Sequence, residues 1–259
     1  MKEVLEIACI QADIAWEQPE ANRNHYETYF QQLDKNTDVV VLPEMFTTGF
    51  SMNPSANAEP MFGTTMHWME THATALDALI LGSLIIEEEG QYYNRLIAMY
   101  PNGTVRYYDK RHLFTLAGEH LEYTKGEERL ELNFRGWKIC PLICYDLRFP
   151  VWSRNTQNFD VLLYVANWPA KRLQAWDVLL KARAIENMCY TIGVNRVGAD
   201  ANNLDYVGHT QVIDALGTAI ATTKEGAQAL LQYSLSKPSL NKVKSALQFL
   251  NDRDFFTIE

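Results

Sequence analysis

The stretch Leu142-Ile143-Cys144-Tyr145-Asp146 places one cysteine where an apolar run gives way to polar residues. The run has the composition of a strand that is buried on both faces. A residue at the end of such a strand can face a cleft while the sheet holds its backbone in place. Cysteines in apolar runs are most often packing residues, but this position makes Cys144 a candidate nucleophile. The other cysteines, Cys9, Cys140 and Cys189, lie inside apolar runs and are expected to be structural.

Strand-like apolar segments recur along the whole chain, and helix-like segments separate several of them. We expect strands over residues 5–10, 39–42, 79–86, 95–100, 106–108, 139–144, 161–166, 190–195, 210–214, 218–221 and 228–234. We expect helices over residues 20–33, 64–75, 175–188 and 238–247. Hairpin signals at residues 101–103 and 215–217 add antiparallel pairs. This mixture favours a layered α/β sandwich over a purely parallel sheet.

The same pattern shows no low-complexity linker and no internal repeat. We therefore expect one domain over residues 1–259, with a core over about 4–234 and a C-terminal helix and tail over about 235–259.

Composition and charge restrict the partners and the compartment. The net charge is −9 and no basic block is present, so nucleic acid is not an expected partner. The first six residues do not resemble a signal peptide, and no apolar run approaches the roughly 18 residues that indicate a membrane span. Four cysteines in apolar stretches favour free thiols in a reducing cytosol. We therefore expect a cytoplasmic protein that does not bind membranes.

Two further strand candidates end in charged residues that suit catalysis. Glu44 follows a run of valines, and Phe46 and Phe50 follow it, so the carboxylate is expected to act as a base against an apolar wall. Lys110 ends the next strand candidate, where its ammonium would stabilise a developing oxyanion and lower the pKa of a nearby thiol. Because strand ends of one sheet face one cleft, Glu44, Lys110 and Cys144 form a candidate constellation.

The histidines offer no better base and no metal site. His112 and His120 flank a loop, and neither has an obvious orienting carboxylate in the sequence. The chain contains no His-Glu-x-x-His and no Cys-x-x-Cys pattern, so we expect no bound metal.

Three segments resemble the signature segments of the nitrilase superfamily of carbon–nitrogen hydrolases. They are Leu42 to Phe46, Tyr108 to Phe114 and Cys144 to Pro150. The resemblance implies a four-layer αββα sandwich that forms a homodimer. It also implies a Glu44-Lys110-Cys144 triad that needs no cofactor, and it identifies Glu119 as the second glutamate that assists the triad.

Within that superfamily the chain is most similar to the bacterial omega-amidases. That similarity implies hydrolysis of the terminal amide of 2-oxoglutaramate and 2-oxosuccinamate through a thioester, with release of ammonia. The substrate is then a small 2-oxo acid omega-amide whose carboxylate needs a positive partner. Arg148 is the first candidate, ahead of Arg172 and Lys171, unless it forms an ion pair with Asp146 or Glu186. The expected apolar walls are Tyr145, Trp168 and Phe46.

Other functions remain open at this point. One alternative is another amidase of the same superfamily, such as a deaminated glutathione amidase or an N-carbamoyl amidohydrolase. A thiol redox protein would need a second cysteine to resolve oxidised Cys144. A non-catalytic binding protein would not need the set of Glu44, Lys110, Glu119 and Cys144 to be intact.

Overall fold

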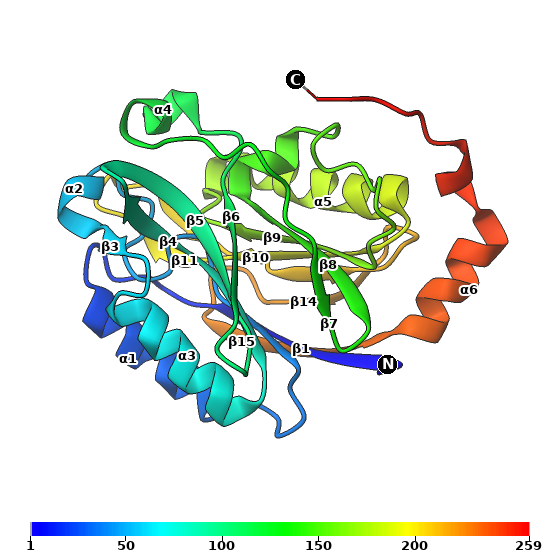
Figure 1. Cartoon of the computed structure of the whole chain (residues 1–259), viewed down its shortest axis with the longest axis horizontal. Helices are drawn as coiled ribbons and strands as arrows, with labels where there is room; N and C mark the ends of the chain where they lie inside the picture. Colours follow the sequence, from blue (N-terminus) through cyan, green and yellow to red (C-terminus); the bar gives the residue numbers. More distant parts are fainter. Residues whose placement is uncertain (1, 259) are drawn as a thin grey trace.

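The computed structural model describes residues 2–258 as two large sheets with helices on their outer faces (Figure 1). The first sheet has the order β15 (Ala229–Ser236), β1 (Val4–Gln11), β2 (Val39–Val41), β4 (Leu79–Glu88), β5 (Gln91–Met99) and β6 (Val105–Asp109), and β3 (Glu59–Pro60) pairs with β4. The second has the order β14 (Ala219–Thr222), β13 (Gln211–Ile213), β10 (Tyr190–Asn195), β9 (Val161–Ala166), β8 (Trp137–Ile143) and β7 (Leu132–Phe134). A separate ribbon pairs β11 (Val197–Ala199) with β12 (Asp205–Val207).

Helices form the outer layers. The helices are α1 (Pro19–Phe30), α2 (Pro54–Asn57), α3 (Thr64–Leu76), α4 (Glu119–Glu122), α5 (Leu173–Asn187) and α6 (Lys237–Leu247). One core cluster joins the inner faces of the two sheets and continues to α5, and a second lies between the first sheet and α1 and α3. The layers are therefore helix, sheet, sheet and helix, which confirms the predicted αββα sandwich.

Burial on both faces explains why the strands are apolar without alternation. In β2, Val39 and Val41 belong to the core between the sheets, whereas Val40 belongs to the core under the helices. In β1, Ile7 and Ile10 divide between the same two cores. Every side chain of such a strand contacts an apolar layer, so the period-2 signal of a half-exposed strand is lost.

The long strands and helices lie at the residues predicted from the sequence, and their ends differ from the prediction by a few residues. Both hairpins are present, between β5 and β6 and between β13 and β14. One boundary matters for the site, because β8 ends at Ile143 and Cys144 begins the 3-10 turn η2 (Cys144–Arg148). The short elements α2, α4, β3, β7, β11 and β12 were not anticipated. The single domain over residues 1–259 stays a prediction.

The strand directions bring two candidate residues to one edge of the first sheet. β2 runs parallel to β4, and β5 runs antiparallel to both β4 and β6. β2 and β6 therefore run the same way, and their carboxyl ends point towards Glu44 and Lys110. Among the described residues, no helix is long and apolar enough to span a membrane.

Candidate active site

Lys110 lies at the centre of the candidate site. It directly follows β6 and is buried, and its Nζ donates to Oε1 of Glu44 at 2.8 Å. The same nitrogen donates to both carboxylate oxygens of Glu119 at 3.0 Å. Burial lowers the pKa of this ammonium, but Glu119 and Glu44 outweigh burial and raise the pKa overall. Lys110 is therefore a cation held between two carboxylates.

Glu119 is fully buried at the first residue of α4. The backbone N–H of Phe114 donates to its Oε2 at 2.5 Å. Burial raises the pKa of Glu119, Lys110 lowers it, and Glu44 raises it again, so the net direction is upward. Two buried carboxylates thus share one cation, Lys110.

Two asparagines that the sequence analysis missed complete the hydrogen bonds of Glu44. Asn94 of β5 donates from Nδ2 to Oε1 of Glu44 at 2.8 Å and to Oε1 of Glu119 at 3.2 Å. Asn167 donates its backbone N–H to Oε2 of Glu44 at 2.8 Å and its Nδ2 to the backbone oxygen of Glu44 at 2.6 Å. Asn167 directly follows β9, and that strand-end position is a signal that could have identified it.

Cys144 opens the turn η2 in a left-handed conformation, with φ of 43°. This region costs a non-glycine residue roughly 1–3 kcal/mol, so neighbouring groups must hold the turn. The fully buried Asp146 does so by accepting from the backbone N–H of Ile143 at 3.0 Å and from the hydroxyl of Tyr108 at 2.7 Å. Cys144 is half-buried, and its Sγ lies 4.0 Å from the backbone oxygen of Asn167.

The thiol of Cys144 is protonated in the resting site. Burial raises its pKa most, the Glu44 carboxylate raises it further, and Lys110 lowers it by less, so the pKa lies well above the usual value. As expected, Lys110 by itself lowers the pKa of Cys144. The expectation is wrong for the net shift, because burial and Glu44 together raise the pKa by more than Lys110 lowers it. A base beside the thiol is therefore needed, and Glu44 is the carboxylate that raises the thiol pKa most.

The three residues come from both sheets and not from one. Glu44 and Lys110 follow strands of the first sheet, whereas Cys144 follows β8 of the second. The strand ends of the two sheets meet at the same place, so the predicted constellation exists, although the topological reason given for it is incomplete.

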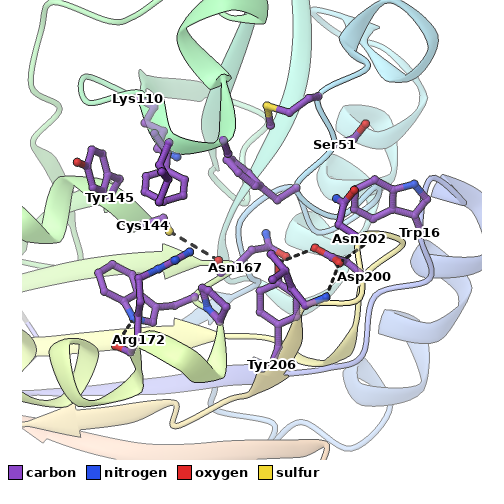
Figure 2. A pocket seen from close by; sticks show the side chains of 18 of the residues that line it. Trp16, Ser51, Lys110, Cys144, Tyr145, Asn167, Arg172, Asp200, Asn202 and Tyr206 are labelled. Carbon is purple, nitrogen blue, oxygen red and sulfur yellow. Dashed lines mark hydrogen bonds between the residues drawn. The ribbon is translucent and has the colours of Figure 1, made fainter.

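Cys144 and Lys110 face a cavity of about 460 Å³ (Figure 2). Tyr145 lies beside Cys144 at one end, and Trp16 and Asn202 lie at the other end (Figure 2). Tyr145 and Trp168 both line the cavity, as expected. Pockets that bind drug-sized molecules have volumes of roughly 300–1,000 Å³. This cavity lies within that range and is therefore large enough for a small acid amide.

Two arginines line the cavity near Cys144. The guanidinium of Arg148 lies 4.9 Å from the ring centroid of Trp168, and that of Arg172 lies 5.0 Å from the ring centroid of Phe114. Within residues 2–258, neither guanidinium is within ion-pair distance of a carboxylate. The alternative ion pairs of Arg148 are not formed, because Glu186 pairs with Arg183 and Asp146 contacts His112.

Phe46 does not line the cavity, and its assignment as an apolar wall needs correction. Its ring is fully buried under the helices, 5.5 Å from the ring of Tyr26 and 6.1 Å from that of Trp68. Met45, between Glu44 and Phe46, has φ of 43°. This left-handed residue breaks the strand geometry, so the two side chains point to different layers. Phe50 lines the cavity instead, with its ring centroid 5.0 Å from Nζ of Lys110.

The remaining candidates lie outside the site or support it indirectly. His112 does have a carboxylate partner, contrary to expectation, because its Nδ1 lies 2.8 Å from Oδ1 of Asp146. Burial raises the pKa of Cys9, Cys140 and Cys189 to about 12. Among the described residues, no group of three or more His, Cys, Asp and Glu side chains is arranged to hold a metal ion.

The chain is similar in sequence and in structure to known proteins. Residues 6–244 match the model of the carbon-nitrogen hydrolase family. Omega-amidase YafV of Yersinia enterocolitica is 44% identical over 254 residues, which cover 98% of each chain. The 2-oxoglutaramate amidase of Bacillus subtilis (strain 168) is 36% identical over 220 residues, which cover 83% of this chain and 85% of the relative. The crystal structure of XC1258 from Xanthomonas campestris, a CN-hydrolase superfamily protein with an arsenic adduct in its active site, superposes with a TM-score of 0.97, at 40% identity and over 100% of both chains.

Proposed function

The chain belongs to the carbon-nitrogen hydrolase family, and we propose that it is an omega-amidase that hydrolyses 2-oxoglutaramate and 2-oxosuccinamate. The observation that carries this proposal is a half-buried thiol beside a buried Glu44-Lys110-Glu119 cluster, in a cavity lined by two arginines. The cluster supplies amide chemistry, and the arginines select an anionic acyl chain. Named relatives with the same activity, matched over most of the chain, support the assignment.

The first half-reaction forms a thioester. Glu44 takes the proton of Cys144 as the sulfur attacks the amide carbonyl, which forms the carbon–sulfur bond. The carbonyl oxygen becomes an oxyanion, which Lys110 and the backbone N–H of Tyr145 stabilise. Glu44 then gives the proton to the amide nitrogen, the carbon–nitrogen bond breaks, and ammonia leaves.

The second half-reaction releases the acid. Glu44, again a carboxylate, takes a proton from water as the water oxygen attacks the thioester carbonyl. The carbon–sulfur bond breaks, the proton returns to Cys144, and the 2-oxo dicarboxylic acid leaves. Glu119 holds Lys110 against the oxyanion through its two 3.0 Å contacts. The chain's own residues supply every proton transfer in this scheme.

Arg148 is the proposed partner of the substrate carboxylate, and Arg172 supports it. Both guanidiniums lie in the cavity wall and are positioned by aromatic rings. An arginine without a carboxylate partner binds a carboxylate ligand with charge-assisted hydrogen bonds. Lys171 is exposed outside the cavity and is not proposed to contribute.

The other thiols argue against the redox alternative. To resolve an oxidised Cys144, a second cysteine must present its own thiolate within reach of the Cys144 sulfur. Cys140 lies in β8, four residues before Cys144, and four residues of extended chain span about 13 Å. It is buried, and its pKa is raised to about 12.

Ammonia release from 2-oxoglutaramate, compared with glutamine, tests the proposed function. We expect turnover of the keto acid amide, little turnover of glutamine, and none of either in Cys144→Ala. Comparable rates on both substrates would contradict the keto acid specificity. Ammonia release by Cys144→Ala would remove the thioester mechanism.

A cytoplasmic homodimer is part of the same proposal. The outer face of α5 exposes Val178 at 57% and Ile185 at 51%, and nearby Leu216 is exposed at 56%. Exposed apolar side chains of this kind favour a protein–protein contact. Light scattering coupled to gel filtration should give a dimer for the native chain and a monomer for the double variant Val178→Asp, Ile185→Asp.

A further inference from the structure

Asn94 completes a ring of four hydrogen-bonded groups. Nζ of Lys110 donates to Oε1 of both Glu44 and Glu119, at 2.8 and 3.0 Å. Nδ2 of Asn94 donates to the same two oxygens, at 2.8 and 3.2 Å. The two Oε1 atoms are thus bridged twice, once by a cation and once by a neutral amide. The two hydrogens of one amide nitrogen suffice for both contacts.

The orientation of the Asn94 amide is fixed by these contacts. Carboxylate oxygens accept and do not donate, so the nitrogen and not the oxygen must face Glu44 and Glu119. The opposite atom, Oδ1, is buried and has no hydrogen-bond partner. An unpaired buried acceptor is costly. A serine or a leucine at this position would avoid that cost, so the two contacts of Nδ2 offset it.

The charges around Asn94 explain why Glu44 and Glu119 need its Nδ2 as a donor in addition to Lys110. Three further ionisable groups face the two glutamates, namely Lys110 after β6, Cys144 on η2 and Tyr123 after α4, and the glutamates also face each other. Lys110 is the single cation in this set, so two ionised glutamates leave a net charge of −1 in a buried site. Hydrogen bonds to a carboxylate favour its ionised form.

We propose that Asn94 is a positioning residue that keeps Glu44 and Glu119 both ionised on one lysine, so that Glu44 is free to accept the proton of Cys144. This inference rests on the proposed function only for the role of Glu44 as base. Asn94 does not line the cavity, so we do not expect it to touch the substrate. It acts on the rate and on the pH dependence, and not on substrate binding.

Two variants at this position separate the proposed role from a general effect on folding. Asn94→Leu removes both donors, so we expect kcat to fall about tenfold or more and KM to stay within about twofold. The acid limb of the pH profile should move up by about one unit, because Glu44 must be ionised. Asn94→Asp retains one O–H donor at low pH. Its introduced carboxyl group ionises as the pH rises and repels both glutamates, so activity should collapse on the basic side.

The rate of Cys144 alkylation by iodoacetamide provides a second measurement that does not require turnover. Its pH profile should shift in both variants as the pH profile of kcat does. Asn155→Asp is the matched control, since Asn155 is equally buried and its amide bonds only backbone groups of Phe159 and Asn187. That control should lose stability without any shift of either profile.

The outcomes distinguish this inference from the proposed function. The positioning role is wrong if the pH profiles of kcat and of alkylation are unshifted in both Asn94 variants and kcat falls only in proportion to the folded fraction. A rise in KM at constant kcat would also overturn it. If the native chain releases no ammonia but the alkylation profile shifts as described, the proposed substrate is wrong and the role of Asn94 stands.

Discussion

The substitution Asp146→Asn should destabilise the protein by several kcal/mol, although it replaces one oxygen with an NH₂ group of nearly equal size. Oδ2 of Asp146 accepts from the Tyr108 hydroxyl at 2.7 Å and from the Ile143 backbone at 3.0 Å. Oδ1 accepts from the His112 backbone at 3.1 Å and lies 2.8 Å from Nδ1 of that ring. Both oxygens therefore face two partners, and an amide offers only one acceptor atom.

The less costly orientation of the new amide places its nitrogen at His112. Tyr108 cannot accept from it, because the tyrosine hydroxyl already accepts from the Arg111 backbone at 3.1 Å and from Nε1 of Trp152 at 3.0 Å. The imidazole of His112 can accept by changing its tautomer, but the backbone N–H of His112 is orphaned. One lost bond to a charged acceptor costs about 1.5–3 kcal/mol, and the two bonds that lose charge assistance cost about 1 kcal/mol each.

The expected loss is on the order of 3–5 kcal/mol, out of a total stability of about 5–15 kcal/mol. For a chain of this size it corresponds to a fall in Tm of roughly 10 °C. Urea denaturation and thermal scans measure both quantities. Asp205→Asn is the control, because Asp205 is exposed and should change stability by less than about 0.5 kcal/mol. A loss below about 1 kcal/mol for Asp146→Asn would refute the assignment of Asp146 as the residue that holds the Cys144 turn.

Three further measurements test other parts of the structure. Arg148→Leu should raise KM for 2-oxoglutaramate about tenfold to hundredfold and leave an uncharged aliphatic amide unaffected; Lys171→Leu is the control, and equal losses on both substrates would exclude a carboxylate contact. Gly82→Ala places a methyl carbon 2.8 Å from Cδ1 of Phe46 and 2.9 Å from Cβ of Leu42, so stability should fall by about 1–3 kcal/mol with KM unchanged; an undiminished urea midpoint would contradict this packing. Burial raises the pKa of Cys189 to about 12, above the ordinary value of about 8.5, so the folded state keeps a proton that the unfolded state loses. Stability should therefore fall as pH rises from about 9 to about 12, and Cys189→Ala should reduce that slope by about 1.4 kcal/mol per pH unit; an unchanged slope would show that the thiol titrates normally.

The long strands could be predicted because their sequence reflects burial on both faces. Val39 to Val41 and Ile139 to Ile143 are apolar throughout, and each lies between two packed layers. Short elements leave no such pattern. β11 and β12 have three residues each and contain polar or small side chains, so tertiary contacts decide their conformation.

The charged residues of the site could be predicted because they interrupt apolar runs. Glu44, Lys110 and Cys144 all follow strands, and the structure places them around one cavity edge. Asn94 could not be found in this way, because an uncharged amide inside β5 looks like any polar residue of a strand. Its role depends on two carboxylates that lie 50 and 25 residues away along the chain.

Phe46 was misplaced for a local reason. Phe46 was expected to line an apolar wall because it follows Glu44 closely, and residues i and i+2 of an extended segment do point to the same face. The left-handed Met45 between them removes that rule, and the backbone N–H of Met45 donates to Oγ of Ser83 at 2.8 Å. A methionine gives no sequence signal for this conformation, unlike a glycine or an asparagine.

The charge of the site determines how the proposed reaction must begin. With both glutamates ionised, as proposed above, Glu44, Glu119 and Lys110 together carry −1, and ionising Cys144 in place would make the buried site −2. Burial and Glu44 accordingly hold the thiol pKa well above its usual value. A thiolate is therefore not stored in the resting enzyme, unlike in sites where a cationic histidine stabilises it. The proton must move to Glu44 as the sulfur attacks, when the negative charge passes to a carbonyl oxygen within reach of Lys110. Proton transfer and attack are then one event, and a substrate carbonyl in position is what makes the cysteine reactive.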